Sequence, residues 1–254
     1  MNHLGIAIET AKKAGAFLID KNTQISTKTS KGKNDWVTDI DIQVEKMIKN
    51  NLQKYFPKYG FNGEESKKVN SRSKYQWVVD PIDSTDNFIR HLPHYTITIA
   101  LLHDNKPVVG IIYDPLTDKL FCAQKNKGAF CNEKPIHVSE TDNLSEALFF
   151  SVPGNREDDN LDEGVRIYEK LLLLRTSMKS WGSVALEIAY VASGNADAAV
   201  YIFSDPYSMP AAKIILEEAG GIMTNMRGKS WNQKSTTTLA SNKRLHNKLI
   251  EYLK

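Results

Sequence analysis

The sequence predicts an α+β protein in which helices and sheets are stacked in layers. Two observations predict this class. In the first 145 or so residues, two segments with apolar residues at helical spacing precede a series of short strands, which is typical of helices packed on an antiparallel meander. In the rest of the chain, helical and strand segments alternate, which favours layered packing around a second sheet.

Two helices are expected near the N-terminus. The first covers residues 1–21 and carries one apolar stripe, made of Leu4, Ile8, Ala11, Ala14 and Leu18. The second covers "IQVEKMIKNNLQKYF", residues 42–56, with a stripe of Val44, Ile48, Leu52 and Tyr55. Between them, the basic stretch "KTSKGKNDW" at residues 28–36 is predicted to be a solvated loop, and attraction of an anionic substrate is its alternative role.

Strands and then alternating elements follow the second helix. The expected strands of the first half are residues 75–80, 95–102 and 106–114, with a strand pair in 119–132. The second half predicts helices at 183–194, 209–221 and 242–253, and strands at 196–203 and 236–241. The segment 139–164 is rich in turn-forming and charged residues, so we place a boundary there. We expect residues 1–145 to carry the metal-binding motifs and residues 146–254 to complete a substrate cleft.

The composition indicates an ordinary globular protein. With 254 residues, 41% of them hydrophobic, the chain is long enough to bury a large core. Its 33 basic and 30 acidic residues leave a net charge of +3, which is too small for a nucleic-acid-binding surface. The first residues lack the pattern of a secretory signal, and charged residues interrupt any membrane span. We therefore expect no nucleic-acid partner and no membrane association.

The cysteines and histidines indicate the cellular compartment and argue against one kind of metal site. Cys122 and Cys131 are the two cysteines, with no CxxC motif, so we expect a cytoplasmic protein with reduced thiols. The six histidines show no HxH or HExxH spacing, which argues against a zinc site.

The stretch "WVVDPIDSTDNF", residues 77–88, carries the strongest chemical signal. Asp80 stands where a buried strand should end, and Asp83 follows three residues later, before Ser84 and Thr85. Asp83 alone could be a helix N-cap, but this leaves Asp80 unexplained. Two carboxylates at a strand end repel each other unless a cation lies between them, and N–H groups at a helix start bind anions. The combination predicts magnesium-dependent chemistry on a phosphate group.

Further carboxylates lie upstream of this stretch. "NGEES" places Glu64 and Glu65 in a loop, and "VTDID" places Asp39 and Asp41 at the start of the second helix. Taken singly, each has a structural explanation as a loop residue or as a helix-start residue favoured by the helix dipole. The DxxD spacing argues against a haloacid-dehalogenase-type phosphatase, because those enzymes use a DxDxT motif, which this chain lacks.

The ordered set "VTDID", "GEES", "DPIDSTDNF", "WGSVALEIAYVASGNADAAV" and "EEAGG" resembles the inositol monophosphatase family, a lithium-sensitive and magnesium-dependent phosphatase superfamily. The resemblance extends over nearly the whole chain. It implies a layered αβαβα sandwich of the inositol monophosphatase and sugar phosphatase type. It also implies a homodimer and a small phosphorylated metabolite as the substrate.

The resemblance implies a metal site made of oxygen ligands. Glu64 and Asp80, with the backbone carbonyl of Ile82, would hold a first Mg²⁺, and Asp80 would bridge to a second ion shared with Asp83. Two or three Mg²⁺ ions are implied in all, with Mn²⁺ as a possible substitute.

The same resemblance assigns catalytic and substrate-binding residues. Asp41 and Thr85 would orient and deprotonate the attacking water. The N–H groups of Ser84 and Thr85 would receive the phosphate. The substrate pocket would be lined by a glycine-led segment, Gly182, Ser183 and Val184.

Two departures from the family pattern stand in the second half. Where the family has Trp-Asp, this chain has Tyr207 and Ser208, so the carboxylate expected to complete the second metal site is a hydroxyl. Asp205 is a candidate substitute, although Pro206 makes the local path hard to predict. At a family position where an acid holds substrate hydroxyls, this chain has Tyr201, either a substrate contact or a core-facing tyrosine.

The sequence thus leads to two functional hypotheses. The first is a magnesium-dependent phosphomonoesterase acting on an inositol phosphate-like compound, a nucleotide 2′- or 3′-phosphate or a sugar phosphate. The second is a catalytically weakened relative that binds a phosphorylated ligand or a partner protein, because Ser208 replaces the metal-binding aspartate.

Overall fold

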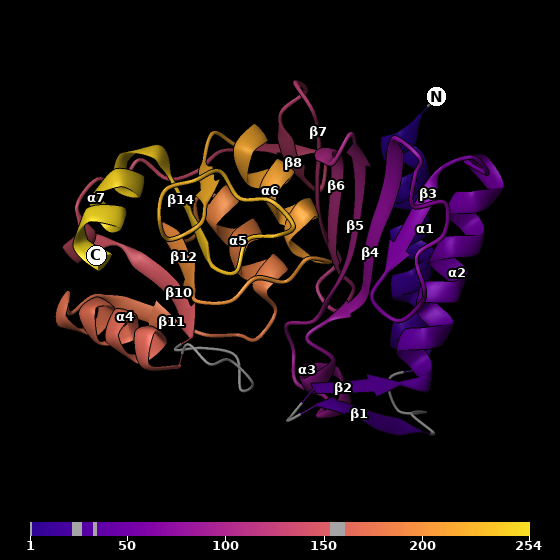
Figure 1. The fold of residues 1–254 in the computed structure, drawn as a ribbon, viewed down its shortest axis with the longest axis horizontal. Helices are drawn as coiled ribbons and strands as arrows, with labels where there is room; N and C mark the ends of the chain where they lie inside the picture. Colours follow the sequence, from indigo (N-terminus) through magenta and orange to yellow (C-terminus); the bar gives the residue numbers. More distant parts are fainter. Residues whose placement is uncertain (1, 22–26, 33–34, 153–160) are drawn as a thin grey trace.

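The chain folds into five layers that alternate between helices and sheets, as Figure 1 shows. The computed structural model describes residues 2–21, 27–32, 35–152 and 161–254. A helix pair covers one face of a seven-stranded sheet, a second pair fills the space between this sheet and a five-stranded sheet, and a third pair covers the outer face of the latter. The αβαβα sandwich expected from the sequence is confirmed.

The first layer consists of α1 (His3–Lys21) and α2 (Asp39–Tyr55), which pack their apolar stripes against the large sheet. Tyr55, predicted to belong to the stripe of α2, is exposed at the end of the helix. Helix α2 begins three residues earlier than the apolar pattern predicted, because Thr38 forms a capping box with Asp41. The Thr38 hydroxyl accepts from the Asp41 N–H, and the Asp41 carboxylate accepts from the Thr38 N–H. This cap fixes an acidic side chain at the edge of the sheet.

The second layer is the seven-stranded sheet, in which neighbours in sequence are neighbours in space. Its strands are β3 (Gly60–Gly63), β4 (Tyr75–Asp83), β5 (Thr96–His103), β6 (Lys106–Asp114), β7 (Lys119–Gln124), β8 (Ala129–Cys131) and β9 (Lys134–Ile136). All pairs are antiparallel except β3 and β4. The predicted meander is therefore confirmed. Strands β3 and β9 were missed because their short sequences, GFNG and KPI, contain glycine or proline, which do not favour strands.

The solvated loop predicted at residues 28–36 is wrong. Strands β1 (Lys28–Gly32) and β2 (Asp35–Thr38) form a two-stranded antiparallel ribbon. The side chains of Lys28, Thr29 and Ser30 are polar and exposed, so the strand shows no alternation of apolar and polar residues. A short helix, α3 (Thr85–Ile89), lies close to β2.

The second half supplies the remaining layers. Its five-stranded sheet has the order β11-β10-β12-β14-β13. The strands are β10 (Leu148–Val152), β11 (Ser177–Lys179), β12 (Ala198–Tyr201), β13 (Ile222–Thr224) and β14 (Thr238–Ser241). The helices are α4 (Leu161–Leu173), α5 (Val184–Ala192), α6 (Met209–Glu218) and α7 (Lys243–Leu253), with a 3-10 turn, η1 (Leu144–Glu146).

The segment predicted to be turn-rich, 139–164, contains more regular structure than expected. It holds η1, all of β10 and the start of α4, while residues 153–160 lie outside the described residues. The boundary near residue 145 remains a prediction. Within the described ranges, none of the helices has the length and apolar character needed to cross a membrane.

The central helix α6 lies very close to the large sheet. A Cβ placed on Gly110 of β6 would lie 2.5 Å from Ile214 Cγ2 and 2.7 Å from the Ala211 carbonyl oxygen. Backbone approaches backbone here, so the spacing between the second and third layers depends on this glycine. The same contact positions the first turn of α6, which begins at Met209.

We predict that Gly110→Ala lowers the free energy of unfolding by about 1–3 kcal/mol, because the new methyl group overpacks the contact with α6. Chemical denaturation followed by circular dichroism measures this loss. The control is Gly5→Ala in α1, whose new methyl group meets the flexible side chain of Asn2, which accepts from the Gly5 N–H at the helix start. Displacing this acceptor offsets the gain in helix propensity, so the effect should be within about 0.5 kcal/mol of neutral. Equal stability of the two variants would contradict the prediction.

Candidate metal centre

Three aspartates from two distant parts of the chain converge between the large sheet and α6. Asp80 and Asp83 lie at the end of β4, and Asp205 lies in the segment between β12 and α6. One carboxylate oxygen from each residue lies within 4.8 Å of the others. Asp80 and Asp83 are only 2% and 4% exposed, so these charges are largely removed from water. Buried carboxylates held this close are typical ligands for a divalent cation.

The end of β4 is irregular, and this irregularity places the acids. The pairing of β4 with β5 shifts register between Asp80 and Asp83, and the Ile82 N–H donates to Asp80 Oδ1 at 3.0 Å. Ser84 then adopts a left-handed conformation with φ of 77°, and α3 begins at Thr85. Asp83 does not cap this helix. Its carboxylate accepts instead from the Ser183 hydroxyl and from the Ala185 N–H, at the start of α5.

The sequence did not determine whether Asp205 reaches the other acids, and in the structure its carboxylate lies beside those of Asp80 and Asp83. Its Oδ1 accepts from the N–H groups of Tyr207 and Ser208, at 2.7 and 3.3 Å, which ties the carboxylate to the start of α6. Ser208 is the residue before the helix, but its hydroxyl caps nothing there. The hydroxyl lies 2.8 Å from Asp80 Oδ2 and also contacts Asp205 Oδ2. Ser208 thus joins the two carboxylates rather than replacing one.

The electrostatics of the cluster are unfavourable without a cation. Burial raises the pKa of Asp80 well above its ordinary value, and the negative charges of Glu64, Asp83 and Asp205 raise it further. Burial, followed by the charge of Asp205, raises the pKa of Asp83 to about 7. Each acid therefore resists ionisation while its neighbours are ionised. A divalent cation would remove this penalty, so the donor set fits such an ion.

Glu64 approaches the cluster from β3, which pairs in parallel with β4. Its N–H donates to the Val79 carbonyl at 3.1 Å, and its charge is the largest influence on the Asp80 pKa after burial. The loop is held by Glu45 of α2, a residue that the sequence analysis missed. Glu45 is 2% exposed, accepts from the Glu65 N–H at 2.7 Å, and lies so close to Gly63 that a Cβ there would clash with its carboxylate. The signal in the sequence that could have identified Glu45 is its position as an acid on the apolar face of α2.

Asp41 and Thr85 form a hydrogen-bonded pair beside the cluster. The Thr85 hydroxyl lies 3.0 Å from Asp41 Oδ1 and 3.2 Å from the Ile82 carbonyl, and its proton can go to one of these at a time. Asp41 is 1% exposed, and burial raises its pKa even though Thr38 and Thr85 donate to it. The structure thus brings together a carboxylate and a hydroxyl that lie 44 positions apart in the sequence.

The glycine-led segment faces the same region from the second half of the chain. Gly182 has φ of 93°, and a Cβ there would lie 3.0 Å from Ser84 Oγ, so the glycine allows the segment to pack on the turn before α3. Ser183 is fully buried and donates to Asp83. Val184 is 7% exposed, and its side chain packs in the central helical layer.

Like Glu45, Glu187 is a buried acid that the sequence analysis missed, and it holds the segment that begins with Gly182. Glu187 Oε1 accepts from the N–H groups of Trp181 and Gly182, and its other oxygen accepts from the Tyr201 hydroxyl. Tyr201 is fully buried, so the structure supports the alternative of a core-facing tyrosine. A single acid within the otherwise apolar segment 184–192 was the signal that could have identified Glu187.

The chain resembles known proteins over its whole length. A family model described as "Inositol monophosphatase family" matches residues 2–254. The chain is 32% identical to "Inositol monophosphatase 1" of Solanum lycopersicum, covering 98% of this chain and 94% of the relative. It is 29% identical to "Nus factor SuhB" of Vibrio cholerae, covering 99% and 95% respectively.

Solved structures agree with this result. The extragenic suppressor protein suhB from Bartonella henselae matches with a TM-score of 0.95 and 30% identity, covering 100% of this chain and 99% of that one. SaIMPase-II, a staphylococcal protein, has been solved with inositol monophosphate (TM-score 0.85, 26% identity, 100% and 94% covered). It has also been solved with 2′AMP (TM-score 0.86, 28% identity, 100% and 95% covered).

We predict opposite effects of Asp205→Asn with and without a cation. Without divalent ions, the substitution removes a charge that repels Asp80 and Asp83, so the melting temperature rises. With Mg²⁺ or Mn²⁺, a carboxylate ligand is lost, and we expect cation affinity to fall by at least about tenfold. Thermal unfolding across a cation titration measures both effects. The control is Asp86→Asn, an acid of α3 that pairs with Arg90 at 2.9 Å. A parallel response of the two variants would refute this assignment.

Cation binding should also depend on pH. Because burial and neighbouring charge raise the pKa of Asp83 to about 7 and that of Asp80 well above its ordinary value, protons and the cation compete for the same oxygens. At lower pH these carboxyls hold protons, so cation affinity is weak, and it rises as the protons leave. Isothermal titration calorimetry with Mn²⁺ between about pH 6 and about pH 8 should show affinity increasing and protons being released. A flat profile would count against cation binding by these acids.

Proposed function

We propose that this chain, which belongs to the inositol monophosphatase family, hydrolyses a small phosphate monoester with divalent cations held by its carboxylate cluster. The family membership supports a phosphatase role. The observation that carries the proposal is the position of Asp205 beside Asp80 and Asp83. It supplies a third carboxylate where the family pattern led us to expect a loss, at Ser208.

The donor set favours Mg²⁺, with Mn²⁺ as a substitute. Asp80, Asp83, Asp205 and Glu64, with the carbonyl of Ile82, would hold such ions, because all of them offer hard oxygen ligands. When bound, such ions neutralise phosphate charge and lower the pKa of water, which phosphate-monoester hydrolysis requires because its uncatalysed rate is so low.

The remaining roles follow from the contacts of the chain. The Thr85 hydroxyl, donating to Asp41, turns its lone pairs toward a water and accepts a proton from it, while the Thr85 proton moves to Asp41 Oδ1. The raised pKa of Asp41 suits it to hold that proton. The N–H groups of Ser84 and Thr85 receive the phosphate, and the segment from Gly182 to Val184 closes the other side of the pocket.

For the substrate, we propose a phosphate on a ring alcohol. The two ligands found with SaIMPase-II, inositol monophosphate and 2′AMP, both carry phosphate on a secondary ring hydroxyl. Tyr201 is fully buried against Glu187 in this chain, so the hydroxyls of the substrate are recognised by other groups. Lithium sensitivity and homodimeric assembly belong to the same proposal, as properties that the family resemblance implies. A cytoplasmic location also belongs to it, because Cys122 and Cys131 form no CxxC motif and are free.

A second candidate function is a role without hydrolysis, as a binding partner of another protein. The observation that favours it is the similarity to proteins named "Nus factor SuhB". Hydrolysis and partner binding can be separated, because only hydrolysis requires the proton transfer between Thr85 and Asp41.

We predict that the protein releases phosphate from inositol monophosphate or 2′AMP only with Mg²⁺ or Mn²⁺, and that Asp41→Asn lowers kcat by about 10²- to 10⁴-fold, because the proton acceptor is lost. Cation-dependent thermal stabilisation should be nearly unchanged in this variant. Asp39→Asn, in the same helical turn, is the control and should keep most of the activity. Cation binding without phosphate release from either compound in the wild-type protein would favour the second candidate function.

A further inference from the structure

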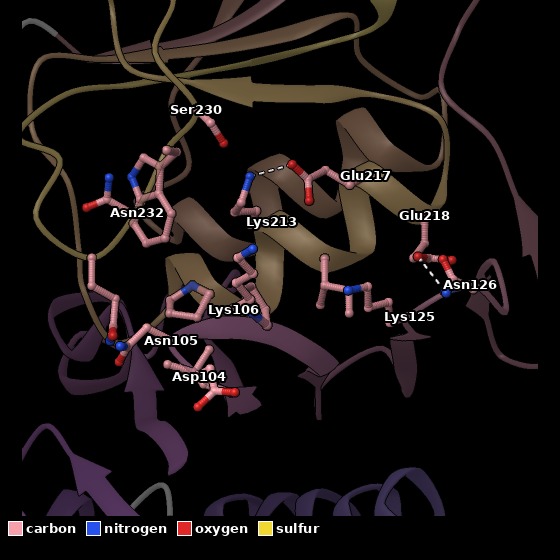
Figure 2. A pocket seen from close by; sticks show the side chains of 16 residues that line it. Asp104, Asn105, Lys106, Lys125, Asn126, Lys213, Glu217, Glu218, Ser230 and Asn232 are labelled. Carbon is pink, nitrogen blue, oxygen red and sulfur yellow. Dashed lines mark hydrogen bonds and ion pairs between the residues drawn. The ribbon is translucent and has the colours of Figure 1, made fainter. Parts of the chain in front are cut away.

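A cavity of ≈ 510 Å³ lies beside α6 (Figure 2), and none of the three clustered aspartates lines it. Four segments enclose it: the β5–β6 turn, the β7–β8 turn, one face of α6 and residues 230–233. Its apolar walls come from Leu102, Pro107, Pro210, Ile214 and Trp231. This volume is within the range of pockets that bind small organic ligands.

The acids that line this cavity are largely occupied by partners. Glu217 pairs with Lys213, which is only 7% exposed, and this pair is drawn in Figure 2. Glu218 accepts from the N–H groups of residues 126, 127 and 128, at 2.8 to 3.1 Å. Asp104 lies 3.5 Å from the ring of His103.

The lining also contains two cations available to a ligand. In the described part of the chain, no ion pair involves Lys106 or Lys125, one at the β5–β6 turn and one at the β7–β8 turn. The lining as a whole carries no net charge, since three lysines stand against three acids, but two of the lysines have no ion pair. Their ammonium groups can contact the charge of an anion whose apolar body displaces water from the walls.

The wall of the cavity is joined directly to the segment that carries Asp205. The Trp231 indole N–H donates to Ser204 Oγ at 2.9 Å, and the Gln233 side-chain amide donates to the Pro206 carbonyl at 3.1 Å. These two bonds hold the residues on either side of Asp205. A ligand that contacts Trp231 and Gln233 therefore acts on the position of a carboxylate in the metal cluster.

We propose that this cavity binds a small organic anion with an apolar body, and that its occupancy is linked through Trp231 and Gln233 to cation binding at the aspartate cluster. The anion site stands independently of the proposed hydrolase activity, while the link rests on the proposed metal centre. By thermodynamic reciprocity, the anion changes cation affinity by the same factor by which the cation changes anion affinity.

The first test uses anilinonaphthalene sulfonate, an aromatic anion whose fluorescence rises when it leaves water. We expect saturable binding of one molecule per chain, weakened by about tenfold or more in Lys106→Glu/Lys125→Glu, because the rim charge is reversed. The control is Lys127→Glu, an exposed lysine of the β7–β8 turn that does not line the cavity. No saturable binding, or binding that the double variant leaves unchanged, would overturn the proposed site.

The second test measures the link without using activity. Dye affinity is compared in Mg²⁺ and in sodium chloride of equal ionic strength, and we expect a change of about fivefold or more. In Gln233→Ala the difference should shrink, because the bond to Pro206 is lost, whereas Lys234→Ala should behave like the wild-type protein. If the dye binds but Mg²⁺ leaves its affinity unchanged, the link is refuted. If Mn²⁺ fails to bind the dye-free protein, the metal centre itself is wrong.

Discussion

The mutual repulsion of buried carboxylates is the constraint on which the site depends. Asp80 and Asp83 are almost fully removed from water, and this burial raises the pKa of both. The charge of the nearby Asp205 raises both pKa values further. A fold that gathers such groups loses stability unless protons or a cation balance the charge. The surrounding donors reduce this cost only in part: Ser183 and Ser208 each donate to one of these acids. These features fit the proposed binding of a divalent cation by the cluster.

The layered fold makes this cluster possible because it brings the end of β4 against the starts of α5 and α6. Asp83 reaches the N–H of Ala185 in one helix start, and Asp80 reaches Ser208 at the other. Before α6, Asp205 lies beside Asp80 and Asp83, and Ser208 stands where the family pattern leads us to expect an aspartate. The hydrogen bonds from Tyr207 and Ser208 to Asp205 show how a turn three residues upstream can present its acid to the same point.

Those parts of the fold that show a regular pattern within a short stretch of sequence could be predicted. The two N-terminal helices, the meander strands and the alternating helices and strands of the second half all show regularly spaced apolar residues. The DPIDST stretch holds its acids within one short segment. The β1–β2 ribbon shows no such pattern, because residues 28–30 of β1 are polar and exposed and β2 is only four residues long. Glu45 and Glu187 bond to backbone N–H groups of loops, so their roles depend on packing rather than on neighbours in sequence. The contribution of Asp205 depends on the path around Pro206, which spacing alone does not determine.

The central claim is that Asp80, Asp83 and Asp205 together bind a divalent cation, and anomalous diffraction from crystals soaked in Mn²⁺ tests it most directly. The account predicts an anomalous peak within coordination distance of all three carboxylates, accompanied by density for phosphate when phosphate is added. Saturating Mn²⁺ with no peak within coordination distance of Asp205, whether or not a peak forms beside Glu64 and Asp80, would contradict it.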